Sequence, residues 1–270
     1  MTEKLLTKLN GIEFSRRDFA RKLGFTGAGL AGVAVLGGLA TRKAFADDGD
    51  NDADDKPAAT DIDILNFALN LEYLEAEFYT IATFGTTIEG AGLIPASAVS
   101  GPTLGPAHTV PNFASSDIAY LASALRDDEQ EHVLFLRKAL GDAAVPKPTI
   151  DLTPLANALA NDEGFIVAAA ELESVGASAY AGAAPMIQSK DVLDAAARIA
   201  LTEAQHTGAM WTEVVRRGFA VPAVDQKLTP PGPTNPFFVD KSGLTIPRTV
   251  QEVLAIVKPL FPNGLNGNIK

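Results

Sequence analysis

Two of the three histidines in this 270-residue chain occur in the same four-residue pattern. Glu129 precedes His132 by three positions, and Glu203 precedes His206 in the same way. Positions three apart lie on one face of an α-helix, so a carboxylate and an imidazole from each helix can reach a common point. The chain has no cysteine, and oxygen and imidazole ligands without thiolate suit iron or manganese. The pattern therefore predicts a metal site between two helices.

A bundle site of this kind needs one further glutamate from each of two other helices. At about 100° per residue, Glu72 shares the apolar face of the segment that begins near residue 61, whereas Glu77 is turned about 140° away. Glu173 shares the apolar face of the segment that ends near residue 184, and Glu171 is turned about 160° from it. We therefore expect Glu72 and Glu173 to point inward and Glu77 to face solvent.

The predicted site thus contains four carboxylates and two imidazoles, whose charges would balance two divalent cations. Buried carboxylates without partners would cost several kcal/mol each, so the cluster is credible only if metal occupies it. The alternative is that the two patterns are surface coincidences. The predicted metal ligands are Glu72, Glu129, His132, Glu173, Glu203 and His206.

The spacing from Glu72 to Tyr79 equals the spacing from Glu173 to Tyr180, which is seven residues in both cases. Each of these segments is followed by one of the two Glu-x-x-His segments. The chain therefore looks like an internal repeat of two helix pairs.

Apolar residues recur at three-and-four spacing in four long segments, and the sequence between them is rich in proline and glycine. Strand signals are too sparse for a sheet. The predicted fold class is all-α, with a four-helix bundle over residues 61–219 and a Pro-rich C-terminal extension over 220–270 that contains one short helix. The predicted helices cover 61–84, 115–140, 155 or 162 to 184, 189 or 191 to 217, and 247–260.

The N-terminal residues have the pattern of an export signal. Ser-Arg-Arg-Asp-Phe at 15–19 precedes a glycine-rich apolar run over 23–40 and Ala-Phe-Ala at 44–46. The adjacent arginines resemble a twin-arginine signal, so we expect residues 1–46 to be removed on export to the periplasm or the cell exterior. The run is too weakly apolar to predict a stable membrane anchor. Residues 47–60 are predicted to be an acidic, disordered leader.

The formal net charge is −11, and no stretch interleaves basic with aromatic residues. Such a chain repels phosphate backbones, so a nucleic-acid partner is not expected.

At these residues the chain resembles the ferritin-like superfamily of carboxylate-bridged di-metal proteins, which includes ferritins, bacterioferritins and rubrerythrins. The stretch from Leu65 through Glu72 to Tyr79 is similar to the first bacterioferritin helix. The export signal, the Leu-Glu-Tyr-Leu-Glu-Ala-Glu-Phe-Tyr word at 71–79 and the Pro-rich tail resemble the desiccation-related, or plain ferritin-like domain, branch.

This resemblance implies a role for each predicted ligand. Glu129 and Glu203 would bridge or chelate both ions and would be the catalytic carboxylates. Glu72 and Glu173 would be terminal ligands, and His132 and His206 would each bind one ion. The cofactor implied is two iron ions, or manganese.

Three functions follow from such a site. The first is an exported redox protein of the ferroxidase or peroxidase type, which handles iron, dioxygen or peroxide in stress protection. The second is a non-enzymatic stress-related or desiccation-related protein in which metal merely staples the bundle. The third is metal storage, which needs an oligomeric shell. The loop over 85–114 is longer than the hairpin of ferritins, which disfavours cage assembly, and its length suggests a lid or binding surface.

Several other residues have an ordinary and a functional interpretation. Glu75 is expected to lie at the surface or beside the ligands, with a seventh ligand as the alternative. His108 is expected to be an exposed loop residue, with an outer metal ligand as the alternative. Tyr79 and Tyr180 are expected to be core aromatics with bonded hydroxyls rather than redox relays. Asp127 and Asp128 are expected on a solvated face rather than in an ion funnel.

Overall fold

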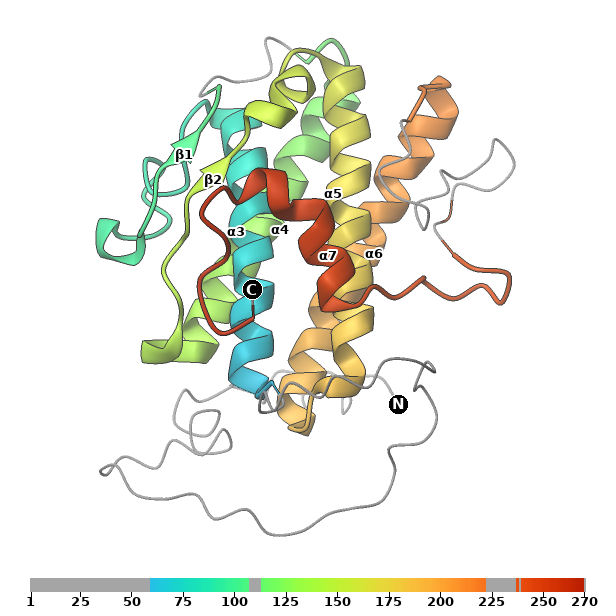
Figure 1. Ribbon diagram of the computed structural model, residues 1–270. Coiled ribbons are helices and arrows are strands. Elements are labelled where there is room, and N and C mark those ends of the chain that lie inside the picture. The colour runs from blue at the N-terminus through green and yellow to red at the C-terminus, as the bar shows by residue number, and fades with distance from the viewer. Residues whose placement is uncertain (1–58, 107–112, 222–236, 238, 270) are drawn as a thin grey trace, which may run out of the picture.

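The computed structural model describes residues 59–106, 113–221, 237 and 239–269. Four long helices lie side by side, and a short fifth helix lies across them near the C-terminus (Figure 1). The predicted all-α, four-helix architecture is therefore confirmed. The α-helices are α3 (Asp61–Phe84), α4 (Ser116–Leu140), α5 (Asp162–Ala183), α6 (Lys190–Arg217) and α7 (Val250–Val257).

The connections carry short elements that sequence periodicity does not predict. Two parallel strands of two residues each, β1 (Thr103–Leu104) and β2 (Ile150–Asp151), join the 85–114 loop to the segment that precedes α5. The third predicted helix begins at its later alternative, because residues 153–159 form a 3-10 helix instead. The 3-10 helices are η1 (Ala96–Ala98), η2 (Gly141–Ala143), η3 (Thr153–Leu159), η4 (Ala184–Met186) and η5 (Lys258–Leu260).

Local chemistry sets the helix ends. Thr60 caps α3 through a capping box with Asp63. Gly85 and Gly218 end α3 and α6 with φ of 68° and 70°, a left-handed conformation that glycine adopts without steric penalty. The bundle helices are therefore delimited by signals that are largely visible in the sequence.

The bundle has an internal two-fold pattern at its helix ends. Asp61, the first residue of α3, accepts hydrogen bonds at 2.9 and 2.8 Å from the two backbone N–H groups just before α6. Asp162, the first residue of α5, accepts two at 3.0 Å from the backbone N–H groups just before α4. Asp61 lies 11 residues before Glu72, and Asp162 lies 11 residues before Glu173. These contacts fix α3 and α5 at matching heights, so their inward glutamates face each other.

The expectation that Glu77 faces solvent is wrong. Its side chain is fully buried beneath the loop between α3 and α4, where Lys147 Nζ lies 2.6 Å from Glu77 Oε1. Thr103 donates a hydrogen bond to the same oxygen at 2.8 Å. Helical angle alone assigned Glu77 to solvent, because it cannot anticipate that a distant loop folds over that face.

The C-terminal extension is fixed to two helices of the bundle. Arg248 is buried and donates hydrogen bonds to the Ser178 hydroxyl and the Ser174 carbonyl of α5. Near the other end, the Asn266 backbone N–H donates to Asn70 of α3 at 3.0 Å, and the Asn70 amide donates back to the Asn266 carbonyl at 2.9 Å. Between these two anchor points, α7 and η5 cross the face formed by α3 and α5 (Figure 1).

Among the described residues, no helix is both long enough and apolar enough to cross a membrane. The predicted signal segment (1–46) and residues 47–58 of the predicted acidic leader lie outside the described residues, as does His108. Residues 59 and 60 of that leader are described, and Thr60 caps α3.

Replacing Lys147 by methionine should destabilise the fold by about 3–5 kcal/mol, because Glu77 would keep a buried charge without its cation. The double variant Glu77→Leu/Lys147→Met should recover most of that loss, since both charges are removed together. Urea unfolding followed by circular dichroism measures both effects. The control is Lys138→Met on the exposed face of α4. A single Lys147 variant as stable as this control would contradict the prediction.

Candidate metal centre

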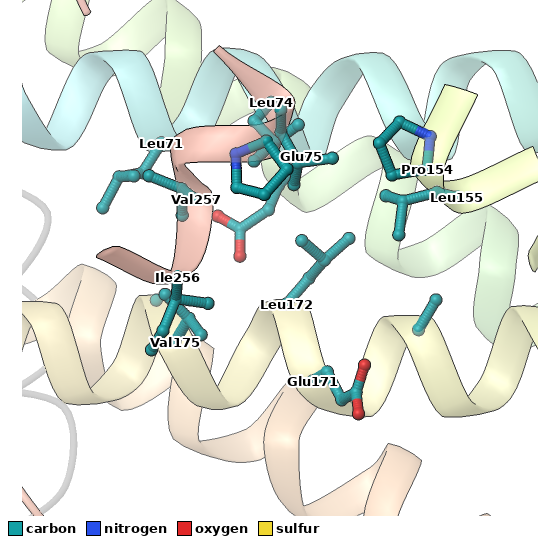
Figure 2. Close-up of a pocket in the computed structure, with 14 residues that line it drawn as sticks. Leu71, Leu74, Glu75, Pro154, Leu155, Glu171, Leu172, Val175, Ile256 and Val257 are labelled. Atoms are coloured by element: carbon teal, nitrogen blue, oxygen red, sulfur yellow. The ribbon is translucent and has the colours of Figure 1, made fainter. Parts of the chain in front are cut away.

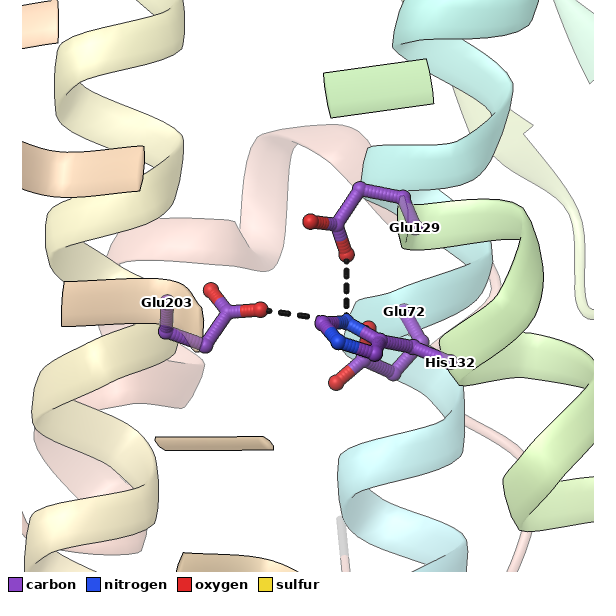
Figure 3. Close-up of side chains that lie close together, drawn as sticks. All are labelled: Glu72, Glu129, His132 and Glu203. Carbon is purple, nitrogen blue, oxygen red and sulfur yellow. Dashed lines mark hydrogen bonds and ion pairs between the residues drawn. The ribbon is translucent and has the colours of Figure 1, made fainter. Parts of the chain in front are cut away.

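All six predicted ligands converge in the middle of the bundle. Each of the four long helices contributes, and every one of the six side chains is buried, the most exposed being His132 at 9%. Figure 3 shows four of them, which approach one another from α3, α4 and α6. By helix, they are Glu72 from α3, Glu129 and His132 from α4, Glu173 from α5, and Glu203 and His206 from α6.

The first half of the centre surrounds His132. Its Nδ1 atom lies 3.2 Å from Glu72 Oε2, 3.1 Å from Glu129 Oε2 and 3.3 Å from Glu203 Oε1 (Figure 3). A single imidazole nitrogen carries at most one hydrogen, so it cannot satisfy three carboxylates at once. Such convergence of acceptors on one point is the arrangement that a cation satisfies.

The second half surrounds His206 in the same way. Its Nδ1 atom lies 3.0 Å from Glu129 Oε1 and 3.1 Å from Glu173 Oε2. Glu203 also belongs to this group, in which all ligand atoms lie within 4.8 Å of one another. Glu129 and Glu203 are therefore shared by both halves. The structure thus shows two ligand groups joined by two carboxylates.

The chemistry of these side chains fits two divalent metal ions. Both carboxylate oxygens of Glu203 and one of Glu129 are buried and have no hydrogen-bond partner among the described residues. Buried acceptors without partners are rare in native proteins and indicate an unseen ion or water. The donor set is four carboxylates and two imidazoles, which suits iron or manganese.

The electrostatics of the protein side chains alone point the same way. Burial raises the pKa of Glu129 to about 7, and the nearby Glu173 adds to this effect. Burial and the charges of Glu129 and Glu173 also raise the pKa of Glu203 well above its usual range. Burial by itself lowers the pKa of His206, but the adjacent carboxylates of Glu129 and Glu173 outweigh that effect and raise it to about 12. Without metal, the site therefore holds protons in place of cations.

Two tyrosines link the two halves of the centre by hydrogen bonds between α3 and α5. Tyr79 of α3 donates a hydrogen bond to Glu173 Oε1 of α5 at 2.5 Å, and Tyr180 of α5 donates one to Glu72 Oε1 of α3 at 2.5 Å. Glu72 and Glu173 are thus each held by the tyrosine of the opposite helix, and the other oxygen of each faces a histidine. The seven-residue spacing shows which helical face these tyrosines occupy, but it cannot show that their bonds cross between helices.

The two halves of the candidate centre differ at the Nε2 atoms of the two histidines. Asp128, whose side chain is 55% exposed, lies 3.0 Å from His206 Nε2. At the equivalent position before Glu203 the chain has Thr202, and no such carboxylate bond is found for His132 among the described residues. Asp128 therefore does more than occupy a solvated face, because it fixes the orientation of one ligand ring.

Comparison with known proteins agrees with this geometry. The model of the family described as "Ferritin-like domain" matches residues 60–215, which include all four bundle helices almost entirely. The chain belongs to the ferritin-like domain family. The resemblance predicted from the Glu-x-x-His pattern and the inward glutamates is thus confirmed, and the buried cluster together with the family indicates a metal-binding site.

Within this ferritin-like family, the chain is similar to the desiccation-related protein PCC13-62 of Craterostigma plantagineum. The two are 30% identical over 156 residues, which cover 52% of this chain and 48% of that protein. The chain therefore spans about half the length of this relative. The match agrees with the predicted desiccation-related branch. No solved structure gives a significant match.

If Glu203 is shared by both ions, Glu203→Ala should remove both, whereas Glu72→Ala should mainly weaken one. We expect the metal content after loading to fall from about two ions per chain to near zero in the first variant, and to about one in the second. Inductively coupled plasma mass spectrometry of the folded variants gives these values. Glu163→Ala, on an exposed position of α5, is the control. Retention of one full ion by Glu203→Ala would argue against a shared ligand.

Metal binding should release protons, because the raised pKa values of His206 and Glu129 keep protons at the metal-free site near neutral pH. Affinity should therefore rise with pH, by about tenfold per pH unit for each proton displaced, and fall on acidification. Calorimetric titration with Mn²⁺ in buffers of different ionisation enthalpy measures the proton count. Buffer-independent heats, with an affinity that is constant from pH 6 to 8, would contradict this expectation.

Proposed function

We propose that this protein is an exported di-iron or di-manganese carboxylate protein that handles iron, dioxygen or peroxide in stress protection. The observation that carries the proposal is the sharing of Glu129 and Glu203 by two ligand groups, each with its own histidine and terminal glutamate. Two metal ions held in this way would supply reversible redox chemistry toward dioxygen or peroxide. The proposed cofactor is two iron ions, with manganese as the alternative.

The proposed roles follow from the contacts of each side chain. Glu129 and Glu203 have buried oxygens without hydrogen-bond partners, so they are free to serve as bridging ligands and to change their mode of binding. Glu72 and Glu173 are held by tyrosine hydroxyls, which suits them to be fixed terminal ligands. His132 and His206 would each complete one position.

The alanine-rich wall of α5 supports the redox role by excluding water. Ala169, Ala170 and Ala177 are buried, lie about one helical turn from Glu173 and carry no polar group. A dry environment keeps electrostatic interactions strong and limits access of competing molecules to the site.

The stress-protective role rests on the name of the desiccation-related relative, and the exported location rests on the twin-arginine pattern at 15–19. Both are proposals for this chain. Cell fractionation of the full-length protein, compared with an Arg16→Lys/Arg17→Lys variant, tests the location. The variant should remain in the cytoplasm in its unprocessed form.

A second candidate is a non-enzymatic protein in which metal only staples the bundle. It is favoured by the connection of all four helices through the six ligands, because metal binding there would contribute directly to folding stability. Metal storage is a further alternative and requires a closed shell of many subunits.

Anaerobic loading with ferrous iron followed by exposure to dioxygen separates these functions. An active centre should oxidise about two ferrous ions per chain within seconds, whereas Glu203→Ala should lose this rapid phase. Oxygen consumption and the ferric absorbance report the rate. Binding of both ions with no rapid oxidation, and no turnover of peroxide, would favour the staple. A monomer or dimer by light scattering would exclude storage in a shell.

A further inference from the structure

A cavity of about 170 Å³ lies beside the candidate metal centre, between α3, α5 and the C-terminal extension (Figure 2). Its walls are mainly leucine, valine, isoleucine and proline side chains. α3 and α5 form the floor, the η3 segment forms one side, and the extension forms the roof with Ile256, Val257, Pro259 and Leu260. None of the six predicted ligands lines this cavity, so it is distinct from the candidate metal site.

The roof of this cavity is held in place independently of any ligand. Arg248 anchors the extension to α5 before the roof, and Asn266 anchors it to α3 after the roof. A cavity bounded by fixed elements keeps its shape when empty, which favours binding because little ordering is then required.

Glu75 is the polar group of this cavity that lies nearest the metal centre. It is 97% buried, being 3% exposed, and its carboxylate points into the space between α3 and α5 (Figure 2). No hydrogen-bond donor reaches it among the described residues. The two-fold pattern places Gly176 of α5 at the position equivalent to Glu75, since each lies three residues after its inward glutamate. The second repeat thus has no side chain at the position that corresponds to Glu75.

Gly176 also marks the place where the cavity meets the centre. A Cβ atom at this position would lie 2.5 Å from Glu203 Oε2 and 3.1 Å from Glu75 Oε1. The absence of a side chain at Gly176 therefore brings both carboxylates to the same wall. A molecule in the cavity that contacts Glu75 would lie next to the shared metal ligand Glu203.

The charges of the lining determine which ligands fit. Glu75 and Glu171 are its ionisable residues, and no lysine, arginine or histidine is among the residues that line it. Burial raises the pKa of both carboxyl groups, and the charges of Glu203 and Glu129 raise that of Glu75 further. A carboxylate or phosphate ligand would meet two acidic groups without a compensating cation, which disfavours anions. A neutral molecule with a hydroxyl or N–H group can donate a hydrogen bond to Glu75, while its apolar part contacts the aliphatic walls.

We propose that this cavity is a binding site for a small neutral molecule with an apolar body and one hydrogen-bond donor, which is directed at Glu75. The volume sets the size, because an apolar protein cavity of about 150 Å³ accommodates benzene. Phenol has the required size and donor, so it is the probe for this site. Binding needs no metal, so the inference does not depend on the proposed redox function.

The test is calorimetric titration of the full chain with phenol, toluene and benzoate, both as purified and after removal of metal. Phenol should bind in both states. It should bind about tenfold more tightly than toluene, because a hydrogen bond to a buried carboxyl group contributes enough to give that ratio. Benzoate should bind at least about tenfold more weakly than phenol, since it would bury a negative charge where no cation lines the cavity.

Two variants assign the binding to this cavity. Ala168→Phe fills the cavity from α5 and should weaken phenol by about tenfold or more, whereas Ala197→Phe, on the exposed face of α6, should leave binding unchanged. Glu75→Met removes the acceptor at similar length and should abolish the preference for phenol over toluene.

Equal affinity for phenol and toluene in the wild-type chain would overturn the proposal, as would phenol binding that Ala168→Phe does not affect. The comparison of the three probes on the wild-type chain needs no variant, so it decides the question even if Ala168→Phe does not fold. A wild-type chain that binds phenol but does not oxidise ferrous iron would overturn the proposed redox function alone.

Discussion

The structure depends on one electrostatic constraint: four glutamates are buried within a few ångströms of one another in the middle of a helical bundle. Their mutual repulsion and desolvation would oppose folding if nothing compensated them. Protons on the two histidines and on the shared glutamates supply part of that compensation, as the raised pKa values of Glu129 and Glu203 indicate. Two divalent cations would supply it fully. The helix ends, the tyrosines and the dry wall of α5 all serve to hold these charges at a fixed separation.

A two-fold repeat positions the six residues of the candidate metal site with a small set of contacts, each used twice. Asp61 and Asp162 set the heights of α3 and α5, and Tyr79 and Tyr180 then hold the inward glutamate of the opposite helix. The places where the repeat fails are equally informative. Asp128 contacts only His206, so the surroundings of the two histidines differ. Gly176 stands opposite Glu75 and leaves room for a cavity on one side of the centre.

The segments outside the four helices bury what the bundle alone would expose. The loop between α3 and α4 supplies Thr103 and covers Glu77, whose charge is compensated by Lys147 from the connection to α5. On the other side, the C-terminal extension crosses α3 and α5 and covers part of the space between them, which leaves an apolar cavity there. A bundle with short hairpins would have neither feature. These additions therefore shape the surroundings of the candidate metal site.

The convergence of these six residues could be predicted from the sequence because helical periodicity is a local property. Glu72 and Glu173 share the apolar face of their helices, and the Glu-x-x-His pattern fixes the other four groups, so six converging residues follow from spacing alone. The environment of Glu77, the crossed tyrosine bonds and the contact of Asp128 with His206 depend on residues 26 to 108 positions away. Such contacts are decided only when the helices and the extension pack together, because no local pattern specifies which distant segment will cover a given face.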